Sequence, residues 1–404
     1  MKRVVITGTG AISACGIGAE ALWTAARNGR SGVRQTLFPT LKRQVILEAA
    51  PISGADYQIA LSTTNPRFQD RVSAIAQVAA GEAIDQAGLG IGDFGERCAV
   101  SIGAGFGGAQ TMDENYHRLL AEGGSRKIDP MCVPKIMTNA PASWIAMKWG
   151  IKGPSYCIST SCSSASQSIG LGAMLVASGT VDRCIAGGAE ALLVPGVFAS
   201  WEAMHVMTND KCRPFSRNRT GMVLGDGAAM FVLESLESAL ARGSKILAEF
   251  AGYGTTNDAG DLLRPDRDGA ARSMRMALDH GRLEPTQIGY VNAHGTGTIA
   301  NDLNETLALR DVFGDRFAEM LVSSTKPIHG HALGAGGALE LLITLKALEE
   351  QVAPPTINFA EMDPKLGFEP VPNVARPFDA DVALSNSFAF GGVNASLALK
   401  RYEA

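Results

Sequence analysis

The sequence lacks the features that mark membrane, secreted and nucleic-acid-binding proteins. Its longest apolar helical stretch, around 169–177, is far shorter than the ~20 residues that cross a bilayer. The apolar run in residues 1–8 ends after three positions, which is too short for a signal peptide. The net charge is −4 without a long run of either sign, and no nucleic-acid-reading motif is present. The sequence therefore predicts a cytoplasmic protein with neither a membrane nor a nucleic-acid partner.

Paired cysteines and long linkers are also missing. None of the seven cysteines forms a CxxC pair, and an odd number scattered over 404 residues indicates reduced thiols rather than disulfides or a zinc site. The 46 glycines follow no collagen-like period, so they indicate tight turns and close backbone approaches. The length exceeds that of a usual single domain, and no proline-rich linker divides the chain. We expect two parts that share one interface.

A phosphate-binding loop of the GxxxxGK[ST] type is absent, and the one glycine-rich candidate is weak. Residues 103–108 match GxGxxG after an expected strand, which by itself suggests a dinucleotide site. However, the motif lies a hundred residues into the chain, and no acidic residue closes a second strand about twenty positions later. Turning of the backbone near a substrate channel explains the glycines equally well. We therefore predict no cofactor.

What the sequence does contain is an alternation of apolar strands and helices. Strands are expected at 3–7, 98–102 and 228–234, and helices at 18–28, 71–87 and 235–242. This order is typical of an α/β fold.

Parts of the pattern occur twice. Residues 4–10 resemble residues 248–254, and the helix after Cys162 resembles the small-residue helix entry at 331–342. Their matching order predicts a duplicated α/β fold with a boundary near residue 245, and so halves of 1–245 and 246–404. Coincidence among glycine- and alanine-rich helices is the alternative explanation.

Cys162 has the setting of a nucleophile. It follows an apolar, β-leaning run and precedes a small-residue helix, with serine and threonine on both sides. A turn from strand to helix would present the thiol beside free helix N–H groups, which favour a thiolate. Most cysteines in cytosolic proteins are buried structural thiols, but hydroxyl-bearing neighbours are unusual for an inert core residue.

Histidines are scarce, and three of the six lie close together in the second half. His294 stands between a strand-like segment at 289–292 and a glycine and threonine loop, so we expect it to project from a strand end. His329 and His331 form an HxH pair that could bind a metal on a strand. Pro327 and Gly330 indicate a loop or a helix entry instead, and no acidic ligand is clustered beside them. Acid–base chemistry is therefore the favoured role, with His331 the better candidate.

Together these motifs resemble the β-ketoacyl-[acyl-carrier-protein] synthases, specifically the elongating class with a Cys-His-His site. The matching segments occur in order over nearly the whole chain: Ser159–Ala165, Gly187–Glu190, Leu224–Ala228, Asn292–Thr298, Asp302 with Glu305, Val322–Lys326, Gly330–His331 and Asn386–Asn394. The resemblance implies the thiolase-like fold, in which two duplicated halves form five αβαβα layers, and a homodimer. It also implies an acyltransferase that uses acyl and malonyl thioesters, with acyl carrier protein as partner.

The resemblance assigns the chemical roles by position. Cys162 would take the acyl chain as a thioester, while His294 and His331 would promote loss of CO₂ from the malonyl group and stabilise the enolate. Phe390 would gate the acyl pocket, and its backbone N–H would form an oxyanion hole with that of Cys162. Two sets of donors are required because negative charge develops on two thioester oxygens. If the helix end lowers the pKa of the thiol, no dedicated base is required.

The remaining assignments follow in the same way. Lys326 and Glu305 would pair and order the histidines. The resemblance implies substrate contacts at Thr296, Thr298, Phe106 and Phe388. It also matches positions that hold a structural monovalent cation in some relatives, where a plain hydrogen-bond cluster is the alternative: Asn292, Ala293, Glu340, Ser385 and Asn386.

Four positions depart from the usual pattern of this family. His329 replaces a threonine, Ala389 and Val393 replace glycine and threonine in the gating motif, and Phe106 occupies a glycine-flanked position that helps shape the acyl pocket in relatives. A phenyl ring in an acyl tunnel would favour short chains, unless the ring points into the core. An alanine restricts a loop that must swing, because its Cβ removes access to positive φ.

Several functions remain open. Besides fatty-acid elongation, a specialised pathway to a polyene, polyketide or nodulation-type acyl chain fits the same motifs. A non-catalytic partner subunit that sets chain length is disfavoured by the intact nucleophile. A degradative thiolase is disfavoured because none of the cysteines lies beyond Cys212. For docking of an acidic carrier protein, Arg67 and Arg71 are the candidates from their position near the start of a helix.

Overall fold

The predicted alternation of strands and helices forms a mixed α/β fold in the computed structural model, which describes residues 1–39, 44–121 and 128–403. Apart from the short β2 (Gly16–Ile17), which pairs with β1, the first half supplies five strands of the main sheet in the spatial order β1-β8-β7-β5-β6. Their bounds are β1 Val4–Ser13, β5 Cys98–Gly103, β6 Ser155–Ile158, β7 Arg183–Glu190 and β8 Gly227–Ser235. The three expected strands are thus confirmed as parts of β1, β5 and β8.

The second half repeats this arrangement. Its five strands lie in the order β9-β15-β14-β10-β11. Their bounds are β9 Ala248–Asn257, β10 Ile288–Asn292, β11 Leu321–Ser323, β14 Val382–Ala389 and β15 Val393–Lys400. In each half the first two pairings are antiparallel and the last two are parallel. The predicted duplication is therefore confirmed, and β1 and β9, which the sequence comparison matched, occupy equivalent places.

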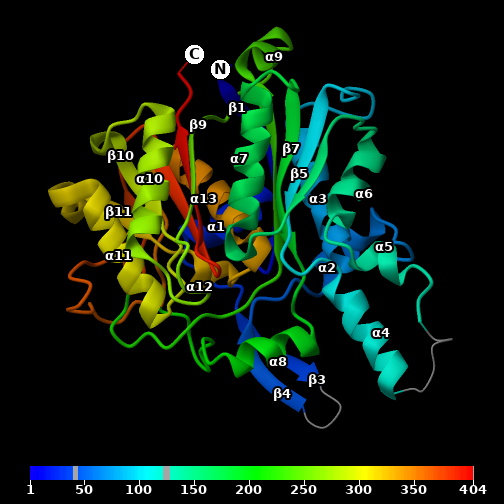
Figure 1. The fold of residues 1–404 in the computed structure, drawn as a ribbon, viewed down its shortest axis with the longest axis horizontal. Helices are drawn as coiled ribbons and strands as arrows, with labels where there is room; N and C mark the ends of the chain where they lie inside the picture. The colour runs from blue at the N-terminus through cyan, green and yellow to red at the C-terminus, as the bar shows by residue number, and fades with distance from the viewer. Residues whose placement is uncertain (40–43, 122–127, 404) are drawn as a thin grey trace.

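The two halves join along β1 and β9, which pair through Val5 with Glu249 and Ile6 with Ala248. Helices α7 (Ser164–Ala177) and α13 (Gly336–Glu350) contact each other between the halves. Outer helices cover the other faces (Figure 1): α3 Arg71–Gln86 and α6 Ala140–Trp149 on the first half, and α10 Arg267–Gly281 and α11 Ile299–Phe313 on the second. The layer order is α, β, α, β, α, as the resemblance implied.

Shorter elements connect these layers. The helices are α1 Ala19–Arg27, α2 Ala55–Ser62, α4 Ala109–Ala121, α5 Cys132–Ile136, α8 Pro195–Ala203, α9 Leu236–Ala241 and α12 Lys326–His329. The strands are β2 Gly16–Ile17, β3 Arg34–Pro39, β4 Gln44–Ala49, β12 Val352–Ala353 and β13 Arg376–Pro377. In the part of the chain that the structure describes there are also four 3₁₀ segments: η2 Ser161–Ser163, η3 Pro285–Gln287, η4 Gly314–Glu319 and η5 Leu333–Ala335. The boundary near residue 245 falls between α9 and β9.

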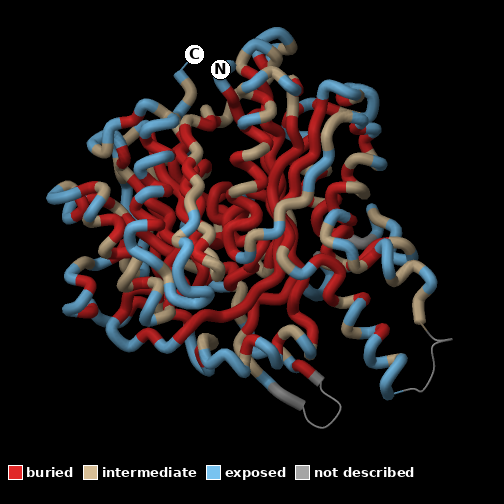
Figure 2. Tube along the Cα trace, viewed as in Figure 1, coloured by how far each residue is buried: buried red, intermediate tan, exposed pale blue. Residues whose placement is uncertain are grey.

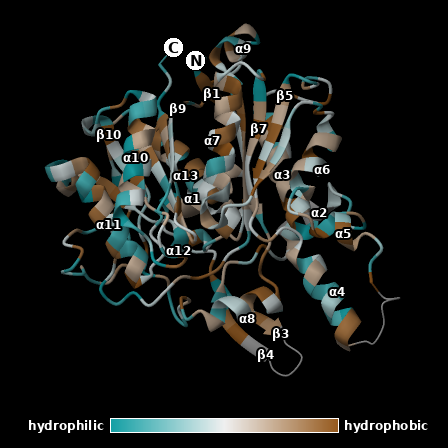
Figure 3. Ribbon diagram, in the orientation of Figure 1, coloured by the Kyte–Doolittle hydropathy of each residue, from teal (hydrophilic) through white to brown (hydrophobic). Residues whose placement is uncertain are grey.

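The core lies along the central helices and the sheet, where burial and apolar character coincide (Figures 2 and 3). Helix α13 is buried on nearly all sides, as expected for a helix enclosed between two sheet layers. Small residues permit this close packing, since a Cβ on Gly103 would lie 2.4 Å from the backbone nitrogen of Ala165 at the start of α7. Among the described residues, no helix has the length and apolar character needed to cross a membrane.

Candidate active site

Cys162 lies on the predicted turn from strand to helix. The turn η2 connects β6 to α7, and Ser161 adopts φ 53°, a left-handed conformation that non-glycine residues rarely adopt. A strained residue next to a nucleophile is typical of sites where the surrounding fold holds a side chain in one orientation. The thiol is buried, with 7% of the residue exposed, and it lines a pocket.

The second half builds an equivalent turn beside it. Leu333 has φ 37°, and the turn η5 leads into α13 as η2 leads into α7. His331 precedes this turn, and its backbone N–H donates to Val223 O over 2.7 Å. Its Nε2 atom lies 3.1 Å from the Sγ atom of Cys162. The duplicated turns therefore bring the nucleophile of one half against a histidine of the other.

His294 projects from the end of β10, as expected, and its ring centroid lies 5.5 Å from that of His331. Glu305 on α11 holds the backbone here by accepting N–H bonds from His294 and Gly295, both at 2.8 Å. Lys326 Nζ lies 3.3 Å from His294 Nδ1. Because an ammonium can only donate, Nδ1 accepts and Nε2 carries the ring proton, leaving an N–H donor for the pocket.

The ion pair of the site differs from the one expected. Lys326 Nζ contacts Glu340 Oε1 at 2.5 Å and donates to the carbonyl oxygen of His294 at 2.5 Å. Glu305, the expected partner, instead accepts hydrogen bonds from the two backbone N–H groups. Both members of the Lys326–Glu340 pair are 1% exposed. A buried charge needs such compensation, which Glu340 supplies from α13.

Burial makes all three reactive groups neutral. It raises the pKa of the Cys162 thiol to about 12, and the nearby Lys326 ammonium only partly offsets this. The expectation that the helix end favours a thiolate is thus wrong, because loss of solvation outweighs the helix terminus. Burial, then Lys326, holds the pKa values of His294 and His331 well below the usual range. The thiol therefore needs a base when it reacts.

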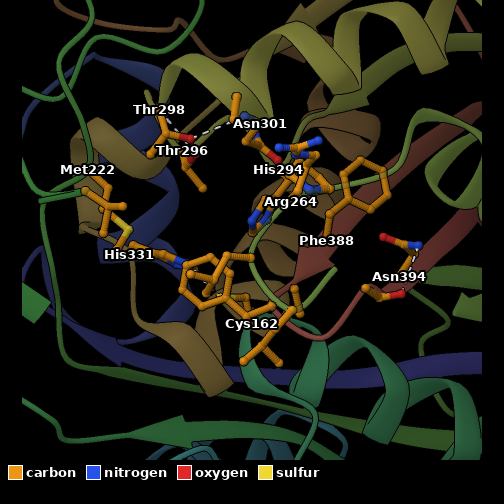
Figure 4. Close-up of a pocket in the computed structure, with 18 of the residues that line it drawn as sticks. Cys162, Met222, Arg264, His294, Thr296, Thr298, Asn301, His331, Phe388 and Asn394 are labelled. Carbon is orange, nitrogen blue, oxygen red and sulfur yellow. Dashed lines mark hydrogen bonds between the residues drawn. The ribbon is translucent and has the colours of Figure 1, made fainter. Parts of the chain in front are cut away.

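The pocket above these groups has a cavity volume of about 140 Å³ and opens to solvent (Figure 4). Thr296 and Thr298 lie on its wall with their hydroxyls 2.9 Å apart, and the ring of Phe388 meets His294 edge to face. The remaining lining comes from these residues: Trp201, Val206, Met222, Leu262, Leu263, Arg264, Pro265, Ala300, Asn301, Ala389, Phe390, Gly392 and Asn394. Three of the four expected substrate-contacting side chains are therefore at the pocket.

The fourth, Phe106, lies elsewhere. It is not among the lining residues of this pocket, and 43% of the residue is exposed, so it does not point into the core either. Phe390 lines the pocket and stacks on Trp201 with ring centroids 5.8 Å apart. Ala389 belongs to β14, and the positive φ angles next to Phe390 belong to Gly391 and Gly392. In this conformation the alanine substitution causes no backbone strain.

His329 is buried and engaged away from the pocket. Its Nδ1–H donates to Gly330 O at 2.7 Å, and its Nε2 atom accepts from the Thr325 hydroxyl at 3.1 Å. Burial and Lys326 lower the pKa of His329 to about 3. A metal site made by His329 with His331 therefore has no support, because both nitrogens of His329 are occupied.

Two buried oxygens bear on the predicted monovalent cation. Asn292 and Ser385 are paired across β10 and β14, and Asn292 Oδ1 and Ser385 Oγ have no hydrogen-bond partner among the described residues. A bound cation would satisfy these two buried oxygens, because an oxygen without a hydrogen-bond partner is free to act as a cation ligand. The side chains of Glu340 and Asn386 already bond to Lys326 and Ser396, respectively, so only the backbone of Ala293 and Asn386 could contribute further. The cation site stays a prediction.

Sequence reasoning missed Glu190, which occupies the glycine-rich loop. Its carboxylate accepts N–H bonds from Gly105 at 2.7 Å, Phe106 at 3.0 Å and Gly334 at 3.1 Å. These donors are the ones that a dinucleotide phosphate would need, so the GxGxxG match has a structural explanation. Gly334 lies in the turn after His331, and Glu190 thus connects the two halves at the site. Its place in the quoted Gly187–Glu190 segment was the only available signal.

Comparisons with known proteins agree with this site. The β-ketoacyl synthase N-terminal domain matches residues 1–239, and the C-terminal domain matches residues 247–360. The chain is 40% identical to nodulation protein E of Rhizobium meliloti (strain 1021), over 99% of each protein. It is 38% identical to 3-oxoacyl-[acyl-carrier-protein] synthase 2 of Staphylococcus aureus (strain N315), over 100% of this chain and 99% of that one.

Solved structures match over the full length of both chains. The ishigamide ketosynthase/chain length factor superposes with a TM-score of 0.93 at 37% identity, covering 100% of each chain. A type II polyketide ketosynthase, solved with its acyl-carrier protein and bound to a hexaketide, superposes with a TM-score of 0.90 at 28% identity, again covering 100% of each.

Glu190 provides a test of how the two halves hold the site. Replacing it with glutamine should destabilise the protein by about 1–3 kcal/mol, because the amide cannot accept all three N–H bonds and places its own donors among them. The decarboxylation rate should fall while alkylation of Cys162 persists. Asp113→Asn is the matched control, since that exposed carboxylate also accepts a backbone N–H, from Gly196. Denaturant unfolding would measure the stability of the Glu190→Gln and Asp113→Asn variants. Equal stability of the two would contradict a positioning role for Glu190.

Proposed function

Because the chain belongs to the β-ketoacyl synthase family, we propose that Cys162 carries the acyl group of a decarboxylative condensation that yields a 3-oxoacyl-[acyl-carrier-protein]. The observation that carries this proposal is the buried cluster of Cys162, His294 and His331 at the floor of an open pocket, with ligand atoms within 4.8 Å of one another. The half spanning 1–245 supplies the nucleophile and the half spanning 246–404 supplies both histidines.

In the first step, Cys162 Sγ attacks the incoming acyl thioester. The thiol proton moves to His331 Nε2, which is already 3.1 Å away, and the carrier thiol leaves with a proton. The backbone N–H groups of Cys162 and Phe390 are the proposed oxyanion donors. Loss of one such donor typically costs about 3 kcal/mol. The role of His331 as base replaces the idea that a low thiol pKa makes one unnecessary.

In the second step, a malonyl thioester enters and loses CO₂. The electron pair of the broken C–C bond forms an enolate, whose oxygen accepts hydrogen bonds from the Nε2–H groups of His294 and of His331, after the His331 ring proton has moved from Nδ1 to Nε2. The enolate carbon then attacks the acyl carbonyl, the C–S bond to Cys162 breaks, and the leaving thiolate takes up a proton from water that enters the pocket. Lys326 supports this step by donating to His294 Nδ1. The ring proton of His294 therefore stays on Nε2, which faces the pocket.

Two pathways fit this chemistry. Elongation of fatty acids is supported by the similarity to 3-oxoacyl-[acyl-carrier-protein] synthase 2, and a specialised acyl product is supported by the higher identity to nodulation protein E. A degradative thiolase has no support, because among the described residues Cys162 is the only cysteine that lines the pocket.

The seven free cysteines suit the reducing cytoplasm that we propose as the location of this protein.

Substitutions separate the proposed roles. Cys162→Ala should abolish covalent acyl labelling, whereas His294→Ala should still be labelled but lose malonyl decarboxylation. His331→Ala should slow both reactions by about 10²–10⁴-fold, because it removes the base and an enolate donor. Rates of labelling, followed by intact-protein mass, and of CO₂ release give the comparison. Labelling of the His331 variant at the wild-type rate would assign the thiol proton to another acceptor.

The carrier-docking candidates need revision. Arg71 pairs with Asp226 at 2.6 Å, stacks on Tyr57 and has a side chain only 13% exposed, so it is a structural residue. Arg67 is exposed beside Phe68 but does not line the pocket. Arg264 is exposed, lines the pocket and forms no ion pair within the described part of the chain (Figure 4). We infer that it contacts the phosphate of the carrier's prosthetic arm.

Reversing this charge should affect carrier-bound substrates only. Arg264→Glu should raise the KM for an acyl-carrier substrate about fivefold, equivalent to about 1 kcal/mol, and weaken its salt dependence. The rate with a short acyl thioester that lacks the carrier should not change. Arg282→Glu, at an exposed arginine that does not line the pocket, is the matched control. An unchanged KM for the carrier substrate would remove Arg264 from the docking surface.

A homodimer is supported by an open sheet edge and by exposed apolar side chains on the elements beside it. Strand β6 forms an edge of the main sheet, and its Tyr156 is 42% exposed. Exposed apolar side chains continue onto neighbouring helices: Met112, Tyr116, Leu119 and Leu120 on α4, Val133 on α5 and Met147 on α6. An open edge strand beside an apolar patch is typical of a surface that another chain covers.

The mass of the purified chain tests this arrangement. We expect sedimentation to show two chains for the wild type and one for Tyr156→Glu, because like charges would face each other across a twofold axis. Leu240→Glu, at an apolar residue that is 56% exposed on α9, should remain dimeric. A wild-type chain that is monomeric until a second, different subunit is added would favour a chain-length partner over a homodimer.

A further inference from the structure

The site combines a thiol with two imidazoles in an arrangement that also suits a metal ion. The potential ligand atoms of Cys162, His294 and His331 all lie within 4.8 Å of one another, and no other group of three or more such residues occurs in the described chain. Two ligands on one tetrahedral zinc ion lie about 3.5 Å apart, given Zn–S and Zn–N bonds of about 2.3 and 2.0 Å. The 3.1 Å between Cys162 Sγ and His331 Nε2 is close to that spacing.

We propose that the unloaded site binds Zn²⁺ through Cys162, His294 and His331, and that this binding reversibly inhibits the enzyme. Three protein ligands leave the fourth tetrahedral position to water from the open pocket, as in other sites with Cys and His donors. Soft thiolate and imidazole donors select zinc and similar ions over Mg²⁺ or Ca²⁺. The binding does not depend on the proposed condensation, whereas the inhibition does.

The protons of the site permit this coordination. The Zn–S bond forms as the Cys162 thiol loses its proton to solvent, and no electron transfer is involved. His331 Nδ1 is buried and has no hydrogen-bond partner among the described residues, so it can hold the ring proton while Nε2 binds the ion. Zinc binding through Nε2 moves the His294 ring proton to Nδ1, so the 3.3 Å contact between Nδ1 and the Lys326 ammonium must open. Lys326 keeps its contacts to Glu340 and to the His294 carbonyl oxygen.

The electrostatic balance limits the affinity without preventing binding. Lys326 is a cation near the metal position, but Glu340 neutralises it at hydrogen-bond distance. The zinc charge is offset in part by the new thiolate. Glu305 and Glu190 are further buried carboxyls in the surrounding shell, and both are held by backbone N–H groups. The ion therefore enters a site with compensating charge.

Acylation of Cys162 should prevent metal binding. A thioester sulfur carries no negative charge and is a poor ligand, and the acyl chain occupies the space above it. Zinc should therefore compete with the first step of the reaction only. Free zinc would inhibit the enzyme whose Cys162 is not acylated, whereas the acylated enzyme could still complete its condensation.

Cobalt provides a spectroscopic test that needs no substrate. The full-length protein, titrated with Co²⁺ as the probe, should bind one equivalent per chain and show a thiolate-to-metal charge-transfer band. Zn²⁺ should displace the cobalt and abolish the band. Cys162→Ser should lose the band, and His294→Ala and His331→Ala should each weaken Co²⁺ binding at least about tenfold. Cys132→Ser is the matched control, because this partly exposed thiol lies outside the site.

Each outcome decides the proposal. A band that persists in Cys162→Ser, disappears in Cys132→Ser or never forms would overturn it. Circular dichroism shows whether each variant is folded, and alkylating wild-type Cys162 with iodoacetamide should remove the band without a mutation. Zn²⁺ should also slow acyl loading, with recovery on adding a chelator. If the protein loads no acyl group but binds cobalt through Cys162, the proposed function fails and the metal site stands.

Discussion

The close approach of two helix starts between the sheet halves is the constraint on which the site depends. A Cβ on Gly337 would lie 2.2 Å from Ser166 Oγ, and one on Gly188 would lie 2.6 Å from Ala165 Cβ. Only side chains of minimal size allow α7 and α13 to begin side by side. Since each helix is preceded by an equivalent strained turn, the packing brings Cys162 and His331 into contact. Duplication of the fold thus creates one site from two halves.

A single buried ion pair then sets the electrostatics. Lys326 and Glu340 compensate each other within a region almost closed to water, so the site holds a cation without being strongly charged. Burial, and after it the ammonium, disfavours protonation of the histidines, and burial disfavours ionisation of the thiol. Burial therefore keeps the Cys162 thiol in its protonated form. Attack on a thioester and binding of a soft metal both require that proton to leave, and this links the reaction to the proposed inhibition.

Local sequence pattern identified the reactive residues because their surroundings are local. The apolar run before Cys162, the hydroxyl-bearing neighbours and the helix after it all lie within a few residues, as do the strand and glycine loop around His294. The paired segments 4–10 and 248–254 revealed the duplication, which appears as β1 and β9. Burial is a property of the whole fold, and for that reason the direction of the thiol pKa shift was predicted wrongly. The ion pair of Lys326 with Glu340 and the burial of the Arg71 side chain were also missed, because both depend on the whole fold.

The sequence by itself determined the elements, their duplication and the three residues that meet at the site, Cys162, His294 and His331, because strand and helix periodicity and turn chemistry act over short stretches of chain. Only the tertiary structure decided which groups meet. Glu190 accepts hydrogen bonds from the adjacent Gly105 and Phe106 and from Gly334, which lies more than two hundred residues further along the chain. Arg264 reaches the pocket from a loop that contains no recognisable motif. Such contacts, and the solvation that sets each pKa, arise when distant segments pack, and no local pattern encodes them.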